Sequence, residues 1–227
     1  MSNKKTYHSR VRYRRTKGGK TKCRILLISG VALFVLFICF VWSFFLKQET
    51  KQTSKILPKL TIQTQLLKKN KYSRPGIPLE KVTGIVVHYT ANPGTNAMDN
   101  RNYFNNLPKI NQDAKSAVFA SSHFVIGLEG QIVQCIPLDE IAYASNERNK
   151  DTIAIECCHP DKTGKFNKAT YEALIELLSY LCIRFDLDED DIIRHYDVTG
   201  KMCPLYYVKH EEQWGKLRKD VKSSRGK

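Results

Sequence analysis

An unbroken apolar run near the N-terminus is the feature that most constrains this chain. Ile25–Leu46 contains 22 residues and no Asp, Glu, Lys or Arg. A helix that crosses a bilayer needs roughly 20 apolar residues, whereas the apolar part of a cleaved secretory signal has about 7–15 and is followed by small residues. This run is longer and ends in the bulky Phe44, Phe45 and Leu46. We therefore expect a retained transmembrane helix at 25–46, with a cleaved signal as the alternative.

Positive charge is concentrated just before the apolar run. Residues 1–24 carry ten Lys or Arg and no Asp or Glu, whereas the rest of the chain has 27 basic and 22 acidic residues, so most of the net charge of +15 lies in this tail. Lys and Arg stay on the cytoplasmic side of a membrane span. We therefore expect a cytoplasmic N-terminus, a single-pass anchor in the cell membrane and an extracellular domain. Because the basic charge is not on the folded part, no nucleic-acid partner is expected.

Composition divides the rest of the chain into a polar segment, a globular part and a short tail. Residues 47–75 are rich in Lys, Gln and Thr and end just before Gly76, which predicts a linker. Residues 76–221 have the apolar patterning of one domain, and residues 222–227 form a basic C-terminal tail. The sequence indicates no particular oligomeric state.

Short apolar, β-branched runs alternate with helical patterns in the globular part. Strands are predicted at Gly84–His88, His123–Gly127, Gln131–Ile136 and Thr152–Cys158, with a hairpin turn at Glu129-Gly130, and the apolar Ile192-Ile193 leads into His195. Helices are predicted at Ala97–Leu107, Asn167–Phe185 and around Val208–Val221. This alternation predicts an α/β or α+β domain with a mixed sheet.

Two histidines and one cysteine have the character of zinc ligands. His88 ends a buried strand, and His195 and Cys203 flank Asp197–Lys201, a Gly-containing loop that is long enough to bring both onto one ion. Catalytic zinc sites usually have three protein ligands and leave a fourth position for water. The alternative is that these are ordinary hydrogen-bonded histidines and a packed cysteine, because the spacing alone is not diagnostic.

Four motifs occur in a characteristic order: GIVVHYT at 84–90, SHFVIG at 122–127, TIAIE at 152–156 and HYDVTGKMCP at 195–204. Together they resemble the type 2 N-acetylmuramoyl-L-alanine amidases, a family that includes phage lysozyme-type amidases and is similar to the peptidoglycan recognition proteins. The resemblance covers roughly residues 78–218. It implies an α/β fold with a central mixed β-sheet flanked by helices, a bound Zn²⁺, and hydrolysis of the amide between N-acetylmuramic acid and L-alanine in peptidoglycan.

The resemblance also implies a role for each matching residue. The three zinc ligands match His88, His195 and Cys203, the last being an Asp in other members. Glu156 matches the carboxylate that activates water, and Lys201 matches the cation beside the metal. Some members have a catalytic Tyr where this chain has Ser122, so the resemblance leaves Glu156 as the base.

Glu156 is also notable without the resemblance, because it is an acid within an otherwise apolar strand. Side chains of a strand alternate between its faces, so Ala154, Glu156 and Cys158 share one face. A buried carboxylate is costly without a partner. A salt bridge to a Lys or Arg at the edge of the core is therefore the alternative to a general base. For Lys201, the alternative is a solvated loop lysine.

The remaining candidates favour structural roles. Cys157, Cys158 and His159 are contiguous, but neighbours on a strand point to opposite faces, which favours buried thiols over a metal cluster. We expect His123 to pack in the sheet and His210 to lie on the surface. Lining of the substrate groove is expected for Tyr89, Thr90 and Asn92, whereas Asp197 either orients a ligand histidine or caps the loop.

Two other classes of function remain open. One is a peptidoglycan-binding protein without catalysis, which the presence of Cys203, Glu156 and Lys201 disfavours. The other is a cysteine hydrolase that pairs Cys203 with His195. Five cysteines follow the anchor, and nothing in their spacing shows that Cys135 or any other of them forms a disulfide.

Overall fold

The structure is a computed structural model that describes residues 37–42 and 60–225. The chain divides into two compact units, 1–55 and 56–227. Residues 37–42 are helical, while the rest of the expected anchor, the basic tail 1–24 and residues 47–59 lie outside the described part. Among the described residues, no helix has the length and apolar character that crossing a bilayer requires.

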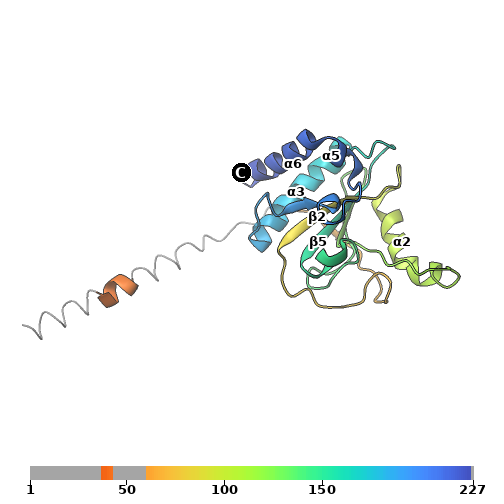
Figure 1. The fold of residues 1–227 in the computed structure, drawn as a ribbon, viewed down its shortest axis with the longest axis horizontal. Coiled ribbons are helices and arrows are strands. Elements are labelled where there is room, and N and C mark those ends of the chain that lie inside the picture. The colour runs from red at the N-terminus through yellow and green to blue at the C-terminus, as the bar shows by residue number, and fades with distance from the viewer. Residues whose placement is uncertain (1–36, 43–59, 226–227) are drawn as a thin grey trace, which may run out of the picture. The chain divides into compact units, whose positions relative to one another are not determined.

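A mixed sheet forms the centre of the second unit (Figure 1). In the described residues it has six strands in the order β1-β4-β3-β5-β2-β6. The bounds are β1 Ile62–Thr64, β2 Gly84–Tyr89, β3 Phe124–Ile126, β4 Ile132–Gln134, β5 Thr152–Cys157 and β6 Ile192–Arg194. All neighbouring strands are parallel except β3 and β4, which form an antiparallel hairpin. The predicted mixed sheet and the predicted hairpin are confirmed.

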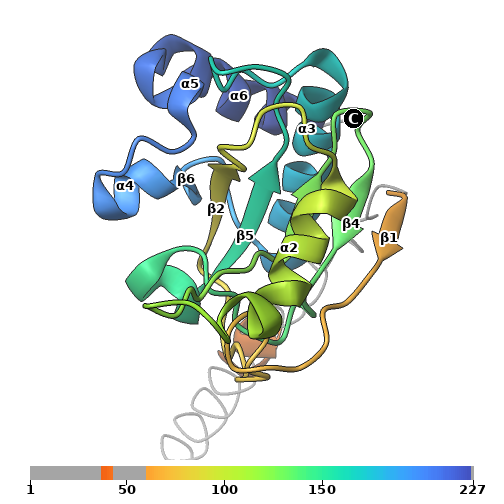
Figure 2. The same ribbon diagram turned by 90° about the vertical axis from the view of Figure 1, so that its right-hand side faces the viewer.

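Helices cover both faces of this sheet (Figure 2). The helical segments are α2 Ala97–Ile110, the 3-10 helix η1 Asn146–Lys150, α3 Lys168–Phe185, α4 His195–Thr199, α5 Leu205–Lys209 and α6 Glu211–Ser224. Helix α2 packs on one face over a cluster that includes Val125, Val133 and Cys158. Helices α3 and α6 pack on the other, where Ile85 and Ile153 lie in the larger core. Alternation along the strands separates these two clusters, so His88 and Glu156 lie on the α2 face.

The segment before β2 is part of the folded domain, which corrects the expected linker at 47–75 and the expected domain start at 76. Strand β1 pairs in parallel with β4, and Leu67 is only 1% exposed. The guanidinium of Arg74 donates two hydrogen bonds of 2.8 Å to the carboxylate of Glu140. The linker prediction was wrong from residue 60 onward, because backbone pairing and a few buried side chains hold this otherwise polar segment.

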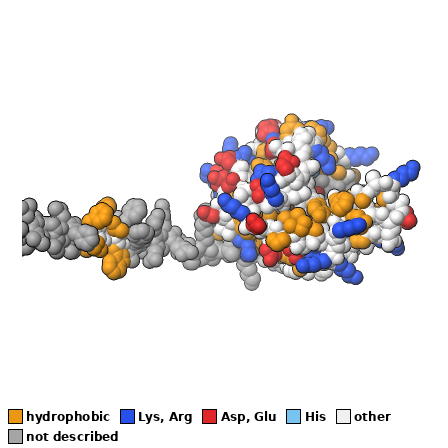
Figure 3. All heavy atoms as spheres, turned by 60° about the horizontal axis from the view of Figure 1, so that its bottom comes forward, with side chains coloured by type: hydrophobic (Ala, Val, Ile, Leu, Met, Phe, Trp, Pro, Cys, Tyr) orange, Lys and Arg blue, Asp and Glu red, His pale blue; other side chains and the backbone are white. Residues whose placement is uncertain are grey.

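The C-terminal region also differs from expectation. The predicted loop Asp197–Lys201 begins as the single-turn helix α4, and the predicted helix around Val208–Val221 is divided into α5 and α6. The prediction of a basic C-terminal tail at 222–227 was wrong for residues 222–225. Helix α6 continues to Ser224, and Arg225 forms an ion pair with Glu189 at 2.6 Å. On the face shown in Figure 3, Lys and Arg are interspersed with Asp and Glu around apolar patches.

Candidate functional site

The three predicted metal ligands meet at the carboxyl end of two neighbouring strands. His88 lies near the end of β2, and His195 directly follows β6, which pairs in parallel with β2. Cys203 returns to the same place, and one possible ligand atom from each of the three residues lies within 4.8 Å of the others. All three side chains are buried. The structure thus brings the three residues together in one place.

A one-turn helix folds the chain back between His195 and Cys203. Gly200 caps the C-terminal end of helix α4, and its φ of +75° is readily adopted by glycine. The N–H of Gly200 donates to the carbonyl of Tyr196. The N–H of Tyr196 in turn donates to the carbonyl of Cys203 at 2.9 Å. Asp197 accepts a 2.8 Å hydrogen bond from the N–H of Arg194 and also pairs with its guanidinium. Of the two roles considered for Asp197, the structure therefore shows the capping one.

The donor atoms fit a metal of the zinc type. The Sγ atom of Cys203 lies 3.8 Å from Nδ1 of His88, and the two imidazole rings have centroids 4.7 Å apart. In His195, Nδ1 is buried and has no hydrogen-bond partner. Two imidazoles and a thiolate form a donor set that suits Zn²⁺, and a bound ion would satisfy the unpartnered nitrogen.

The two histidines are held in the form that binds metals. Burial lowers the pKa of His88 well below its ordinary value, and repulsion from His195, when that ring is protonated, and from Lys201 lowers it further. Burial and the charge of Lys201 also lower the pKa of His195. Both imidazoles are therefore neutral at pH 7, each with one lone pair available for an ion.

Glu156 lies beside the ligand cluster, at the same register position on β5 as His88 on β2. Its Oε2 atom is buried without a hydrogen-bond partner, and burial raises the pKa of the carboxyl to about 8 although the charge of Lys201 opposes this. No ion pair of Glu156 is found in the described part of the chain, so the expected alternative of a salt bridge is not seen. A carboxyl in this state is suited to exchange protons near neutral pH.

All five residues assigned by the resemblance line one pocket of about 430 Å³. Lys201 lines this pocket and is exposed. Tyr89 and Thr90 also line it, as predicted, whereas Asn92 is not among its lining residues. The pocket is further lined by Phe119, which is 53% exposed, and Tyr143. Their rings are T-shaped with centroids 5.9 Å apart, and sequence reasoning did not identify either.

Sequence reasoning also missed two loop residues that touch the ligand histidines. The Oγ atom of Ser145 lies 3.1 Å from Nε2 of His88, and Oδ1 of Asn146 lies 3.3 Å from Nε2 of His195. Ser145 immediately precedes η1, and Asn146 is its first residue. No motif marks them, because the contact depends on how a loop some 50 residues distant from either histidine returns to the site.

The other predicted structural residues lie where the sequence indicated. Cys157 and Cys158 are buried in opposite core clusters, and Cys135, Cys157, Cys158, Cys182 and Cys203 are all free thiols in the described residues. Both ring nitrogens of His123 are hydrogen-bonded, one to the carbonyl of Glu140 and one to the N–H of Ala154. His210 is exposed.

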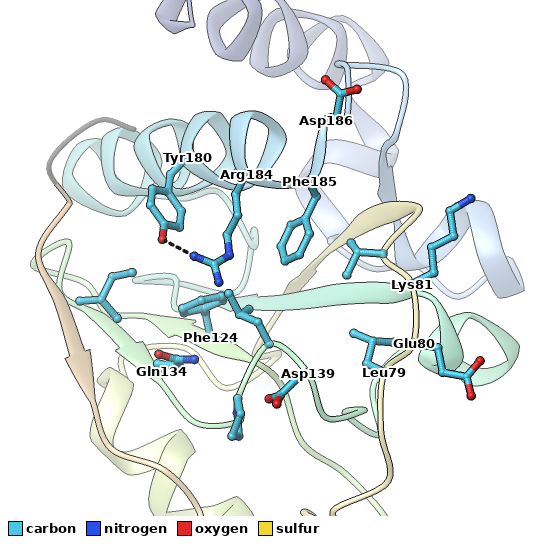
Figure 4. Close-up of a pocket in the computed structure, with 14 residues that line it drawn as sticks. Leu79, Glu80, Lys81, Phe124, Gln134, Asp139, Tyr180, Arg184, Phe185 and Asp186 are labelled. Carbon is cyan, nitrogen blue, oxygen red and sulfur yellow. Dashed lines mark hydrogen bonds between the residues drawn. The ribbon is translucent and has the colours of Figure 1, made fainter. Parts of the chain in front are cut away.

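A larger pocket of about 920 Å³ is lined by residues of β1, β3, β4 and the end of α3. There Tyr180, Arg184 and Phe185 project from the end of α3 toward Phe124 and Gln134 (Figure 4). No His or Cys lines this pocket. The grouping of three possible metal ligands with a buried carboxyl therefore makes the smaller pocket the candidate functional site.

Comparisons with known proteins agree with this location. Residues 78–205 match the Amidase_2 family, described as N-acetylmuramoyl-L-alanine amidase. The chain is 38% identical over 173 residues to the N-acetylmuramoyl-L-alanine amidase CwlL of Bacillus licheniformis, covering 70% of this chain and 46% of that protein. It is 34% identical over 175 residues to the N-acetylmuramoyl-L-alanine amidase BlyA of Bacillus subtilis (strain 168), covering 68% and 45%. The chain thus spans a little under half the length of these curated relatives.

Solved structures show the same fold. The catalytic domain of XlyA is 26% identical with a TM-score of 0.57, covering 71% of this chain and 99% of that one. The structure of PlyL has a TM-score of 0.59 at 21% identity, covering 71% and 97%, and shows the likeness of the fold alone. The family model matches more than half of the sequence, and its boundaries enclose His88, Glu156, His195, Lys201 and Cys203. The chain belongs to the N-acetylmuramoyl-L-alanine amidase family Amidase_2.

Proposed function

We propose that this chain is a zinc-dependent hydrolase that cleaves the amide between N-acetylmuramic acid and L-alanine in peptidoglycan. The observation that carries the proposal is the convergence of His88, His195 and Cys203 on one point of a pocket that also contains Glu156. The substrate class is supported by the family and by relatives that are named N-acetylmuramoyl-L-alanine amidases.

Each side chain of the pocket has a chemical role in this reaction. Zinc held by His88, His195 and Cys203 would polarise the amide carbonyl and acidify a water molecule. Glu156 accepts a proton from the attacking water and delivers it to the leaving amine of L-alanine, so that the amide C–N bond breaks with proton balance. Lys201 places its positive charge where the carbonyl oxygen becomes negative.

The test uses the purified full chain and isolated cell walls. Metal analysis is expected to give one zinc per chain, and incubation with walls is expected to release free amino groups of L-alanine. A chelator should abolish this release, and added zinc should restore it. Binding to walls without new L-alanine amino termini would instead support the binding-protein alternative.

The cysteine hydrolase alternative is disfavoured by the surroundings of the thiol. Cys203 is 3% exposed, and burial together with the charge of Glu156 raises its pKa to about 12. A nucleophilic cysteine requires a lowered pKa and access to substrate. Its sulfur lies 3.8 Å from Nδ1 of His88, whereas this alternative requires a pairing with His195.

We also propose that the apolar run 25–46 anchors the domain on the outer face of the cell membrane, within reach of the wall. The support is the length of that run and the ten basic residues that precede it. In cells that express the full chain, the protein should stay in the membrane fraction after an alkaline wash. Protease added to protoplasts should digest the domain. Release of a protein whose N-terminus lies beyond residue 46 would show a cleaved signal instead.

A further inference from the structure

Two consecutive loop residues contact the two histidines of the proposed metal site, each through Nε2 of the ring. Ser145 Oγ is 3.1 Å from Nε2 of His88, whose Nδ1 faces the sulfur of Cys203. Asn146 Oδ1 is 3.3 Å from Nε2 of His195, whose Nδ1 is buried and unpartnered. In both rings the loop therefore contacts Nε2, and Nδ1 has no contact with the loop.

The chemistry of these contacts determines which nitrogen carries the proton. A neutral imidazole has one N–H and one lone pair. The amide oxygen of Asn146 only accepts hydrogen bonds, so Nε2 of His195 must carry the proton and its Nδ1 must carry the lone pair. A serine hydroxyl accepts equally well, so Ser145 allows the same arrangement in His88.

The loop is held in place independently of the histidines. The Oδ1 atom of Asn149 accepts hydrogen bonds from the N–H groups of Ala144 at 2.9 Å and of Ser145 at 2.6 Å. The N–H of Arg148 donates to the carbonyl of Ser145 at 3.0 Å. Asn146 has a φ of +52°, which non-glycine residues adopt only at a cost and which Asn tolerates better than most. The loop therefore presents its two acceptors in a fixed position.

We infer that Ser145 and Asn146 are positioning residues that hold both ligand histidines with the proton on Nε2, so that the two Nδ1 atoms and the Cys203 sulfur converge on one metal ion. This inference rests on the proposed zinc function, which it deepens by naming the groups that orient the ligands. Such outer contacts fix the orientation of a ligand ring and strengthen it as a donor.

The test measures zinc affinity rather than hydrolysis. In the full chain, Asn146→Gly removes the acceptor while glycine retains the positive φ, and Ser145→Ala removes the hydroxyl. Each is expected to weaken zinc binding about 10–100-fold, as measured by competition with a chromophoric chelator. Asn146→Asp keeps an acceptor oxygen and is expected to bind zinc about as tightly as the parent chain. The spectrum of bound Co²⁺ reports whether the ligand geometry changes in each variant.

Ser122→Ala is the matched control. Its hydroxyl is also fully buried and lies 2.9 Å from the carbonyl of Phe124 and 2.8 Å from that of Ala154, either of which accepts its one proton. Its loss therefore removes a buried hydrogen bond that involves neither histidine. Unchanged zinc affinity in both Asn146→Gly and Ser145→Ala overturns the positioning role, as does equal weakening in Ser122→Ala. An absence of zinc binding in the parent chain is a different outcome, because it overturns the proposed function itself and this inference with it.

Discussion

His88 and Glu156 are register partners on the neighbouring parallel strands β2 and β5. Adjacent strands lie about 4.8 Å apart, so the sheet itself sets the spacing between His88, a proposed metal ligand, and Glu156, the proposed base. The spacing depends on backbone hydrogen bonds and is independent of the conformation of the glutamate side chain. Side-chain changes at residue 156 therefore test chemistry without moving the ligand.

Glu156→Gln should reduce hydrolysis without loss of zinc. The amide is isosteric but does not accept the proton of the attacking water, so kcat is expected to fall about 10²–10⁴-fold. Release of L-alanine amino groups from walls measures the rate, and metal analysis measures the zinc content. Glu172→Gln, on an exposed part of α3, is the control and should keep full activity. A fully active Glu156→Gln variant would remove Glu156 from the mechanism.

The same substitution should change how stability of the metal-free chain depends on pH. Burial raises the pKa of Glu156 to about 8, so the folded state binds its proton more tightly than the unfolded state does. The resulting stability is present below the ordinary pKa of 4.5 and is lost as the pH rises to about 8. The Glu156→Gln variant does not lose stability in this way. The free energy of unfolding of the variant, relative to that of the parent chain, should therefore increase by about 1–3 kcal/mol between low and high pH. Urea unfolding in the presence of a chelator at pH 5 and pH 9 measures this difference in the free energy of unfolding. A difference that is the same at both pH values contradicts the buried-carboxyl explanation.

Cys203 variants separate a metal ligand from a nucleophile. At a zinc concentration 100 times the Kd, the parent chain should gain about 2.7 kcal/mol in the free energy of unfolding. Cys203→Ala should lose most of this gain, because only two ligands remain. Cys203→Asp supplies an alternative ligand and should retain zinc and part of the activity. An Asp variant that binds zinc normally but shows no hydrolysis would favour the cysteine nucleophile.

Leu67→Ala tests the finding that the domain begins well before residue 76. Leu67 is 1% exposed and packs among the residues below α2, so its truncation should lower the free energy of unfolding by about 2–5 kcal/mol. Leu66→Ala is the neighbouring control, at a partly exposed position, with an expected cost of about 1 kcal/mol. Equal small effects in a urea titration would mean that this segment contributes little to the fold.

Sequence patterns predicted those parts of the fold that are determined by apolar periodicity. Strand β5 and helix α3 lie within a residue or two of their predicted bounds, because both bury regular apolar faces. Strand β1 was missed, because its three residues are mostly exposed and are held by backbone pairing. The turn of α4 was missed because its stability comes from the cap that Asp197 forms with Arg194, a contact that loop composition does not reveal.

Only part of the candidate site could be predicted from the sequence, because only some of its residues lie in a recognisable pattern. His88, His195 and Cys203 fall in motifs with a recognisable order, and Glu156 is a charged residue in an apolar strand. Ser145 and Asn146 have neither mark. Their relevance comes from a loop conformation that Asn149 maintains, and such tertiary contacts leave no periodic pattern in the sequence.

The late position of β6 along the sequence has a consequence for partial chains. β6 and the turn after it supply His195 and Cys203, whereas His88 comes from β2, which is completed much earlier in synthesis. A growing chain that has emerged only through α3 carries one of the three metal-binding side chains. A chain cut short after α3 would therefore lack His195 and Cys203, two of the three donors of the proposed zinc site.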